Sequence, residues 1–220
     1  MAAARAGAQR ILLGVGGSAT TDGGLGALQA VRAGGGLRGA HLTVLCDVRT
    51  PYERAAEVYG PQKGADAETV ARLTSRLLAT AAWLPRDPRG RPMTGAAGGL
   101  SGALWADLGA ELVPGVQAVL DAVGFDALLG GADLVLTGEG RLDAQTAEGK
   151  VVAGVARRAA AKGVPVHAVV GRCDLDDAGL AVLGLAGAVE AGDPGALRSA
   201  ARTLTSARRR ALSRRDAPSG

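Results

Sequence analysis

The sequence predicts an α/β protein with parallel sheets. Short runs of aliphatic and β-branched residues, bounded by Gly or Asp, indicate buried strands, and patterns with helical spacing separate these runs. From residue 133 onward strand and helix alternate, and this β-α-β succession predicts parallel strands joined by right-handed crossovers. The predicted strands, which we expect to be buried on both faces, cover residues 10–15, 41–48, 133–138, 164–171 and 187–192.

The segments between these strands carry helix signals. A helix is expected over residues 66–83, with Asp66 as its N-cap. Pro114 indicates the first turn of another helix, because the N–H that proline lacks is unpaired there in any case. Residues 94–109 predict a helix with a face of small side chains, which permits close approach of another backbone or of a ligand; helix packing is the simpler use. A further helix is expected over residues 151–162.

The positive charge of the chain belongs to its C-terminal tail. The 220 residues carry a formal net charge of +4, but residues 202–220 contain six arginines and one aspartate, which leaves about −1 for the rest. Aromatic residues make up only 2% of the chain, so there is little surface on which bases could stack. We therefore expect no nucleic-acid partner.

Composition also indicates a compartment. No apolar run approaches the length that spans a membrane, and the N-terminus lacks a continuous apolar signal segment. Cys46 and Cys173 lie far apart without metal-ligand spacing, which is typical of buried thiols in a reducing compartment. We expect a cytoplasmic protein without a membrane partner, and whether it forms a homo-oligomer stays open.

A glycine-rich segment, GVGGSATTDGG at residues 14–24, joins the first strand to a helical pattern. A turn of this kind exposes successive backbone N–H groups at the positive end of a helix, which suits phosphate or another anion. The segment matches neither common nucleotide-binding fingerprint, so a purely structural tight turn stays open. Its carboxylate, Asp22, could hold Mg²⁺ or a substrate hydroxyl, or it could cap the following helix.

A second polar segment, LTGEGRLDAQTAEGK at residues 136–150, is expected to be a loop at the end of a strand. Glu139, Arg141 and Asp143 alternate there with small or apolar neighbours. Ligands of open α/β sheets bind at the carboxyl ends of strands, so this trio could recognise an acidic substrate and coordinate a divalent ion or activate a hydroxyl. A surface loop held by salt bridges is the alternative.

Lysine and histidine residues are rare in this chain. Lys63 stands between Gln62 and Gly64 in YGPQKGAD, where it could act as a point charge for phosphate or carboxylate, or be an ordinary exposed loop lysine. His41 opens one predicted strand and His167 lies inside another, so both are expected to be structural. This placement argues against a Ser-His-Asp hydrolase.

Five motifs taken in order resemble the glycerate kinase type I family. They are ILLGVGGSATTDGGLGALQA, CDVRTP, YGPQKGA, GAAGGLSGAL and GADLVLTGEGRLDAQTAEGK, and they extend over nearly the whole chain except its tail. The resemblance implies phosphorylation of D-glycerate with ATP and Mg²⁺. It also implies a Rossmann-like or flavodoxin-like domain with a second α/β domain inserted into it.

The family architecture suggests how this chain is divided. Residues 1–127 would be the inserted α/β domain, 128–204 the C-terminal half of the Rossmann-like domain, and 205–220 a disordered, Arg-rich tail. The family's usual N-terminal portion has no counterpart here, so the Rossmann-like domain is expected to be incomplete. The two groups of motifs would line a cleft between the domains.

In-line transfer of the ATP γ-phosphoryl group to a glycerate hydroxyl is the mechanism that the resemblance implies. Asp22 or Asp143 would hold Mg²⁺ or orient the hydroxyl, with Glu139 as a further catalytic carboxylate, and Arg141 or Lys63 would bind the substrate carboxylate. The alternatives are a truncated, inactive family fragment and a module that binds an acidic metabolite without phosphoryl transfer. Which hydroxyl is phosphorylated stays open. The phosphate groups would be cradled by Gly16, Gly17, Ser18, Thr20 and Thr21.

Overall fold

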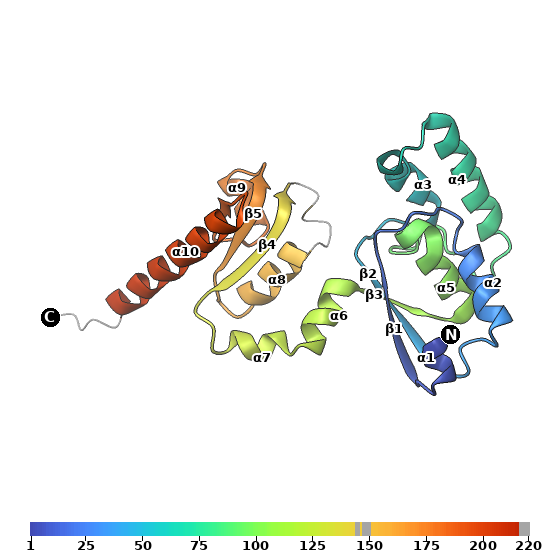
Figure 1. Ribbon diagram of the computed structural model, residues 1–220, viewed down its shortest axis with the longest axis horizontal. Coiled ribbons are helices and arrows are strands. Elements are labelled where there is room, and N and C mark those ends of the chain that lie inside the picture. The colour runs from blue at the N-terminus through green and yellow to red at the C-terminus, as the bar shows by residue number, and fades with distance from the viewer. Residues whose placement is uncertain (144–145, 147–150, 216–220) are drawn as a thin grey trace. The chain divides into compact units, whose positions relative to one another are not determined.

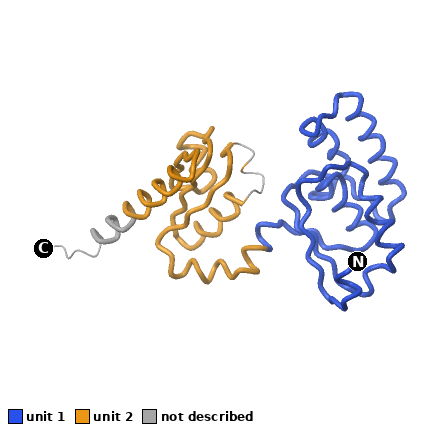
Figure 2. Tube along the Cα trace, in the orientation of Figure 1, with its two compact units in different colours: residues 1–118 blue, residues 119–220 orange. Residues whose placement is uncertain are grey.

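The computed structural model describes residues 1–143, 146 and 151–215, with the backbone alone over 208–215 (Figure 1). The chain divides into two compact units, residues 1–118 and 119–220, which are coloured separately in Figure 2. Over the described residues, each unit contains one three-stranded parallel sheet. The predicted α/β class with parallel sheets is therefore confirmed.

Unit 1 is built around the sheet β1-β2-β3, in which both neighbouring pairs are parallel. A helix or a longer helical segment connects each strand to the next, as parallel pairing requires. The strands are β1 (Arg10–Val15), β2 (His41–Cys46) and β3 (Glu111–Pro114). The helices are α1 (Ala2–Arg5), α2 (Leu25–Ala33), α3 (Ala55–Tyr59), α4 (Ala67–Ala81) and α5 (Leu100–Leu108), with 3₁₀ turns η1 (Tyr52–Arg54), η2 (Pro61–Lys63) and η3 (Ala96–Gly99).

The core of unit 1 lies on one face of this sheet. Side chains of β1 and β2 pack there with α2 and α5, and Val44 is fully buried. Residues of β1 alternate between exposed and more buried positions, and Leu12 remains 61% exposed. The prediction that the strands are buried on both faces is therefore wrong for β1, because α2 and α5 cover only one face of the unit 1 sheet.

Two local predictions meet different outcomes in unit 1. Asp66 caps α4 by accepting a hydrogen bond from the Thr69 N–H at 2.8 Å, which confirms that helix start. Pro114 is the last residue of β3, which the sequence did not predict, and the next helix, α6 (Gly115–Ala122), begins one residue later. A proline is compatible with β3 because this strand lies at the sheet edge, where fewer N–H groups are needed for pairing.

Unit 2 repeats the parallel arrangement with the strand order β4-β5-β6. Helix α8 packs against β4 and β5, α9 against β6, and α10 against β5. The strands are β4 (Val135–Leu142), β5 (Val166–Cys173) and β6 (Gly187–Glu190). The helices are α7 (Phe125–Leu129), α8 (Val151–Ala160), α9 (Asp177–Val182) and α10 (Pro194–Arg215).

The predicted ends of two segments in unit 2 differ from the structure. Strand β4 continues to Leu142, four residues beyond the predicted end at 138, so Glu139 and Arg141 lie on a strand and not on a loop. Helix α10 continues to Arg215 into the segment expected to be a disordered tail, and residues 216–220 lie outside the described part.

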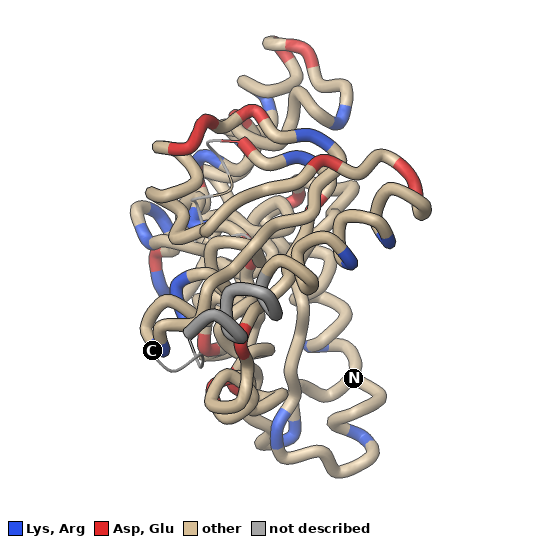
Figure 3. The backbone as a smooth tube through the Cα atoms, turned by 90° about the vertical axis from the view of Figure 1, so that its left-hand side faces the viewer, with Lys and Arg blue, Asp and Glu red and all other residues tan. Residues whose placement is uncertain are grey.

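In the described part of the chain, no helix is both long and apolar enough to cross a membrane. Figure 3 shows acidic and basic residues interspersed along the described backbone.

Cys46 is buried and Cys173 is partly buried, and both are free thiols. Burial raises the pKa of Cys46 to about 11.

Candidate functional site

The glycine-rich loop begins where β1 ends and is fixed at its far end by the core of unit 1. The Gly23 N–H donates to the Gly98 carbonyl at 3.0 Å, and the buried Tyr52 hydroxyl donates to the Gly23 carbonyl at 2.9 Å. Gly98 has φ +66°, and a Cβ there would overlap the Thr20 carbonyl oxygen, so the two backbones meet at a position that only glycine fills without strain. The small residues of the 94–109 segment thus serve to bring another backbone close.

Asp22 caps the beginning of α2. Its Oδ1 accepts from the Gly24 N–H and its Oδ2 from the Gly26 N–H, both at 3.0 Å. This is the capping role that the sequence left open, and a role in holding Mg²⁺ or substrate stays a prediction. Burial, followed by the negative charge of Asp22, raises the pKa of the Tyr52 hydroxyl well above its ordinary value.

A pocket of about 220 Å³ opens at the carboxyl ends of β1 and β2, entirely within unit 1. Lys63 reaches across it, and its Nζ donates to the Ser18 Oγ at 2.9 Å. Burial lowers the pKa of Lys63 below its ordinary value. The structure thus brings together four predicted site residues, Gly16, Gly17, Ser18 and Lys63, whereas Thr20 and Thr21 do not line this pocket.

Three polar residues of the same pocket were not predicted. Asp47 follows β2 directly, and because Val15 pairs with Cys46, the next residues of the two parallel strands lie side by side. A Cβ on Gly16 would lie 3.2 Å from the Asp47 Oδ2. Tyr59 and Gln62 line the pocket as well. All three lie in the motifs CDVRTP and YGPQKGA. The sequence alone does not show that the first two strands pair, and this pairing is what brings Asp47 beside Gly16.

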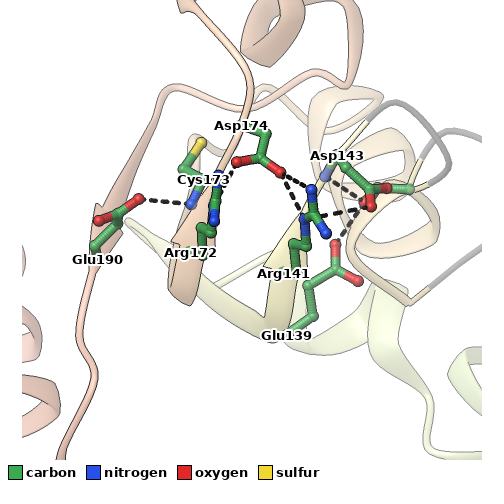
Figure 4. Close-up of polar contacts among 8 residues, drawn as sticks. Glu139, Arg141, Asp143, Arg172, Cys173, Asp174 and Glu190 are labelled. Carbon is green, nitrogen blue, oxygen red and sulfur yellow. Dashed lines mark hydrogen bonds and ion pairs between the residues drawn. The ribbon is translucent and has the colours of Figure 1, made fainter.

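A second polar cluster lies at the carboxyl ends of β4 and β5 in unit 2 (Figure 4). Asp174 lies between two guanidinium groups: the Arg141 Nε donates to its Oδ2 at 2.5 Å and the Arg172 Nε to its Oδ1 at 2.6 Å. These hydrogen bonds hold the pKa of Asp174 below its ordinary value. Arg141 also lies 3.9 Å from the Asp143 carboxylate.

A threonine links two of the three residues predicted in this segment, Glu139 and Asp143. The buried Thr146 hydroxyl donates to the Glu139 Oε1 at 2.8 Å and accepts from the Asp143 N–H at 3.2 Å. Arg141 approaches Asp143 to 3.9 Å, so the three residues lie in one connected cluster, and whether this cluster binds a ligand or is a salt-bridged surface stays open. Thr146, Arg172 and Asp174 were missed, and residues 144–145 and 147–150 of the predicted segment lie outside the described residues.

Over the residues that the structure describes, no three His, Cys, Asp or Glu side chains gather closely enough to hold a metal ion. A Mg²⁺ ion bound with a nucleotide needs only one or two protein carboxylates, because phosphate oxygens and water complete its octahedron. Single carboxylates such as Asp143 meet that requirement, whereas a resident ion would need a denser donor set.

Two units, each with a parallel sheet and with polar side chains at the carboxyl ends of its strands, define a parallel α/β protein, a class in which ligands bind at those strand ends. A sequence profile described as the glycerate kinase family matches residues 1–34 and 32–213. The chain belongs to the glycerate kinase family.

Individual relatives agree with this assignment. The protein named glycerate kinase from Halalkalibacterium halodurans is 42% identical over 200 aligned residues, which cover 75% of this chain and 53% of the relative. Glycerate 2-kinase from Escherichia coli K12 is 36% identical over 213 residues, covering 81% and 56%. A crystal structure of a candidate glycerate kinase 2 from Salmonella typhimurium LT2 has a TM-score of 0.64 at 37% identity, covering 86% of this chain and 58% of that one. The chain spans about half the length of the curated relatives it matches.

Proposed function

We propose that this protein takes part in the ATP-dependent phosphorylation of D-glycerate in the cytoplasm. The observation that carries the proposal is the unit 1 pocket, in which the glycine-rich loop and Lys63 meet in a chain of the glycerate kinase family. A glycine-rich loop at the end of a strand, together with one ammonium group, suits an anionic substrate.

The unit 1 pocket would recognise the anionic parts of the reactants. Ser18 and the backbone of Gly16 and Gly17 offer hydrogen-bond donors to phosphate or carboxylate oxygens, and Lys63 supplies a positive charge beside them. Thr20 and Thr21 continue the same loop toward α2, where further phosphate contacts would form. Positioning and charge neutralisation of this kind supply most of the rate in phosphoryl transfer.

The unit 2 cluster would contribute the second set of groups. Arg141 is paired with Asp174, so a substrate carboxylate or phosphate would bind its guanidinium in competition with that ion pair. Glu139 and Asp143 share Thr146 and would orient a hydroxyl or hold an ion.

Magnesium fits these residues as an ion that arrives with ATP. When bound, Mg²⁺ neutralises charge on the transferring phosphoryl group. Asp22 and Asp143 are the two predicted ligands; both carboxylate oxygens of Asp22 already accept backbone hydrogen bonds, which an ion would have to share.

The test is a coupled assay of ADP release from the full chain with ATP, Mg²⁺ and D-glycerate. Asp143→Asn is expected to lower turnover by at least about tenfold, and Asp22→Asn to lower it less. Glu68→Gln, an exposed carboxylate on α4, is the matched control. Unchanged turnover in both aspartate variants would remove these residues from the mechanism. Glycerate binding by calorimetry without ADP release would instead favour the binding-module alternative.

A further inference from the structure

The unit 1 pocket contains a carboxylate that has no hydrogen-bond or ion-pair partner among the residues that the structure describes. Asp47 is exposed, lines the pocket, and among the described residues makes no hydrogen bond or ion pair. Other acidic groups near the two clusters are engaged: Asp22 caps α2, Asp174 binds two arginines, and Glu190 accepts from the Cys173 N–H at 2.7 Å. An unused carboxylate inside a pocket is a group available to a ligand.

The other groups of the pocket restrict what that ligand can be. Lys63 and the backbone of Gly16 and Gly17 favour an anion, whereas Asp47, next to Gly16, repels one. A ligand that carries both a carboxylate and a hydroxyl satisfies both sides, because it can place its anion at Lys63 and donate its hydroxyl to Asp47. The volume of about 220 Å³ is below the 300–1,000 Å³ typical of sites for drug-sized ligands, so a compact molecule fits better than a nucleotide.

We propose that Asp47 is a substrate-binding residue that accepts a hydrogen bond from a hydroxyl of a small hydroxy acid whose carboxylate pairs with Lys63. This inference rests on the proposed function, in which D-glycerate is that hydroxy acid. Asp47 would then select acids that carry a hydroxyl at the matching carbon. An acid without that hydroxyl would bind more weakly, because the Asp47 carboxylate would stay without a hydrogen-bond donor beside the bound acid.

The experiment is calorimetric titration of the full chain with D-glycerate, with no nucleotide and no Mg²⁺, so that a metal role cannot contribute. Asp47→Ala is expected to weaken glycerate binding about 10- to 100-fold, the loss typical of a hydrogen bond to a charged group. Asp47→Asn, which keeps a neutral acceptor, is expected to fall between Asp47→Ala and the wild type. Glu68→Gln, outside the pocket, is expected to bind as the wild type does.

Two substrate analogues locate the hydroxyl. Lactate lacks the hydroxyl on C3 of glycerate, and 3-hydroxypropanoate lacks the hydroxyl on C2. The wild type is expected to bind one of them about 10- to 100-fold more weakly than glycerate, and Asp47→Ala is expected to lose that discrimination. The discrimination is the readout that a merely structural effect of the substitution would not abolish.

The outcomes separate the two proposals. If Asp47→Ala binds glycerate as tightly as the wild type, or more tightly because a repulsive charge has gone, the role of Asp47 is overturned while glycerate binding stands. If Asp47→Ala and Asp47→Asn both weaken glycerate binding but keep the full discrimination between the two analogues, the role of Asp47 is overturned too. If the wild type itself neither binds nor phosphorylates glycerate, the proposed function fails and this inference fails with it.

Discussion

Replacing Tyr52 with phenylalanine tests whether the glycine-rich loop is anchored by the core of unit 1. Tyr52 is fully buried, and its hydroxyl donates to the Gly23 carbonyl at 2.9 Å. The ring itself packs against Gly99 and Gly102, where a Cβ would lie 2.8 Å or less from ring carbons, so phenylalanine keeps the packing. The substitution therefore removes one hydroxyl and leaves the buried Gly23 carbonyl without this donor.

The magnitude follows from that geometry. A buried polar group left without its partner costs about 1–3 kcal/mol in the free energy of unfolding. For a unit of this size each kcal/mol lowers Tm by about 3–6 °C. We therefore expect Tyr52→Phe to destabilise unit 1 by about 1–3 kcal/mol.

Tryptophan fluorescence in urea measures this effect on unit 1 alone, because Trp83 and Trp105 both lie in that unit. The urea midpoint should fall with an unchanged m-value. The control is Tyr59→Phe, which deletes the same atom from a partly buried site, where its hydroxyl lies 2.6 Å from the Thr50 Oγ1. A Tyr52→Phe variant no less stable than Tyr59→Phe would refute the anchoring argument.

Three further predictions concern the loop and the charged groups. Gly98→Ala should cost more than about 2 kcal/mol, because the left-handed backbone alone costs about 1–2 and the new Cβ also meets the Thr20 carbonyl; urea unfolding followed by tryptophan fluorescence checks this. The pKa of Asp174, followed by NMR of its carboxyl carbon, should lie below the ordinary value of 3.8, and Arg172→Gln should raise it. The stability that Asp174 contributes is present above pH 3.8 and is lost as the pH falls through the pKa of the folded state. Burial lowers the pKa of Lys63 below 10.5, so its ammonium form is lost at a lower pH than in a free lysine. Calorimetric affinity for D-glycerate should therefore fall as the pH rises through that lowered pKa. Lys63→Arg should not show this fall.

The sequence predicted correctly those features that depend only on neighbouring residues. The N-cap at Asp66 needs only one side chain and the backbone that follows it, and the structure confirms it. The predicted strand ends at residue 138, four residues before β4 ends, because Gly138 and Gly140 are typical of turns. Pairing with β5 brings the Val169 carbonyl so close to Gly138 that a Cβ there would overlap it, so in this strand glycine allows close approach of the neighbouring backbone.

The site shows the same division between local and long-range information. Ser18 and Lys63 were predicted separately, but their contact depends on a fold that joins residues 45 positions apart. Asp47 and Asp174 were missed because their importance comes from the neighbouring strand: parallel register sets one beside Gly16, and the other between two arginines. Both residues directly follow the observed strands β2 and β5, but the predicted strands ended at residues 48 and 171, so the sequence did not place either aspartate at a strand end.

The two candidate partners of the glycerate carboxylate are not equivalent. Among the described residues, Lys63 bonds only to a neutral hydroxyl, so a substrate carboxylate would gain a charge-assisted bond there at little cost. Arg141 is already paired with Asp174 and lies near Asp143, so a substrate would have to compete with existing ion pairs. We therefore expect Lys63→Met to weaken glycerate binding about 10- to 100-fold in calorimetry and Arg141→Met to weaken it less than about tenfold. The reverse order would move the carboxylate-binding role from unit 1 to unit 2.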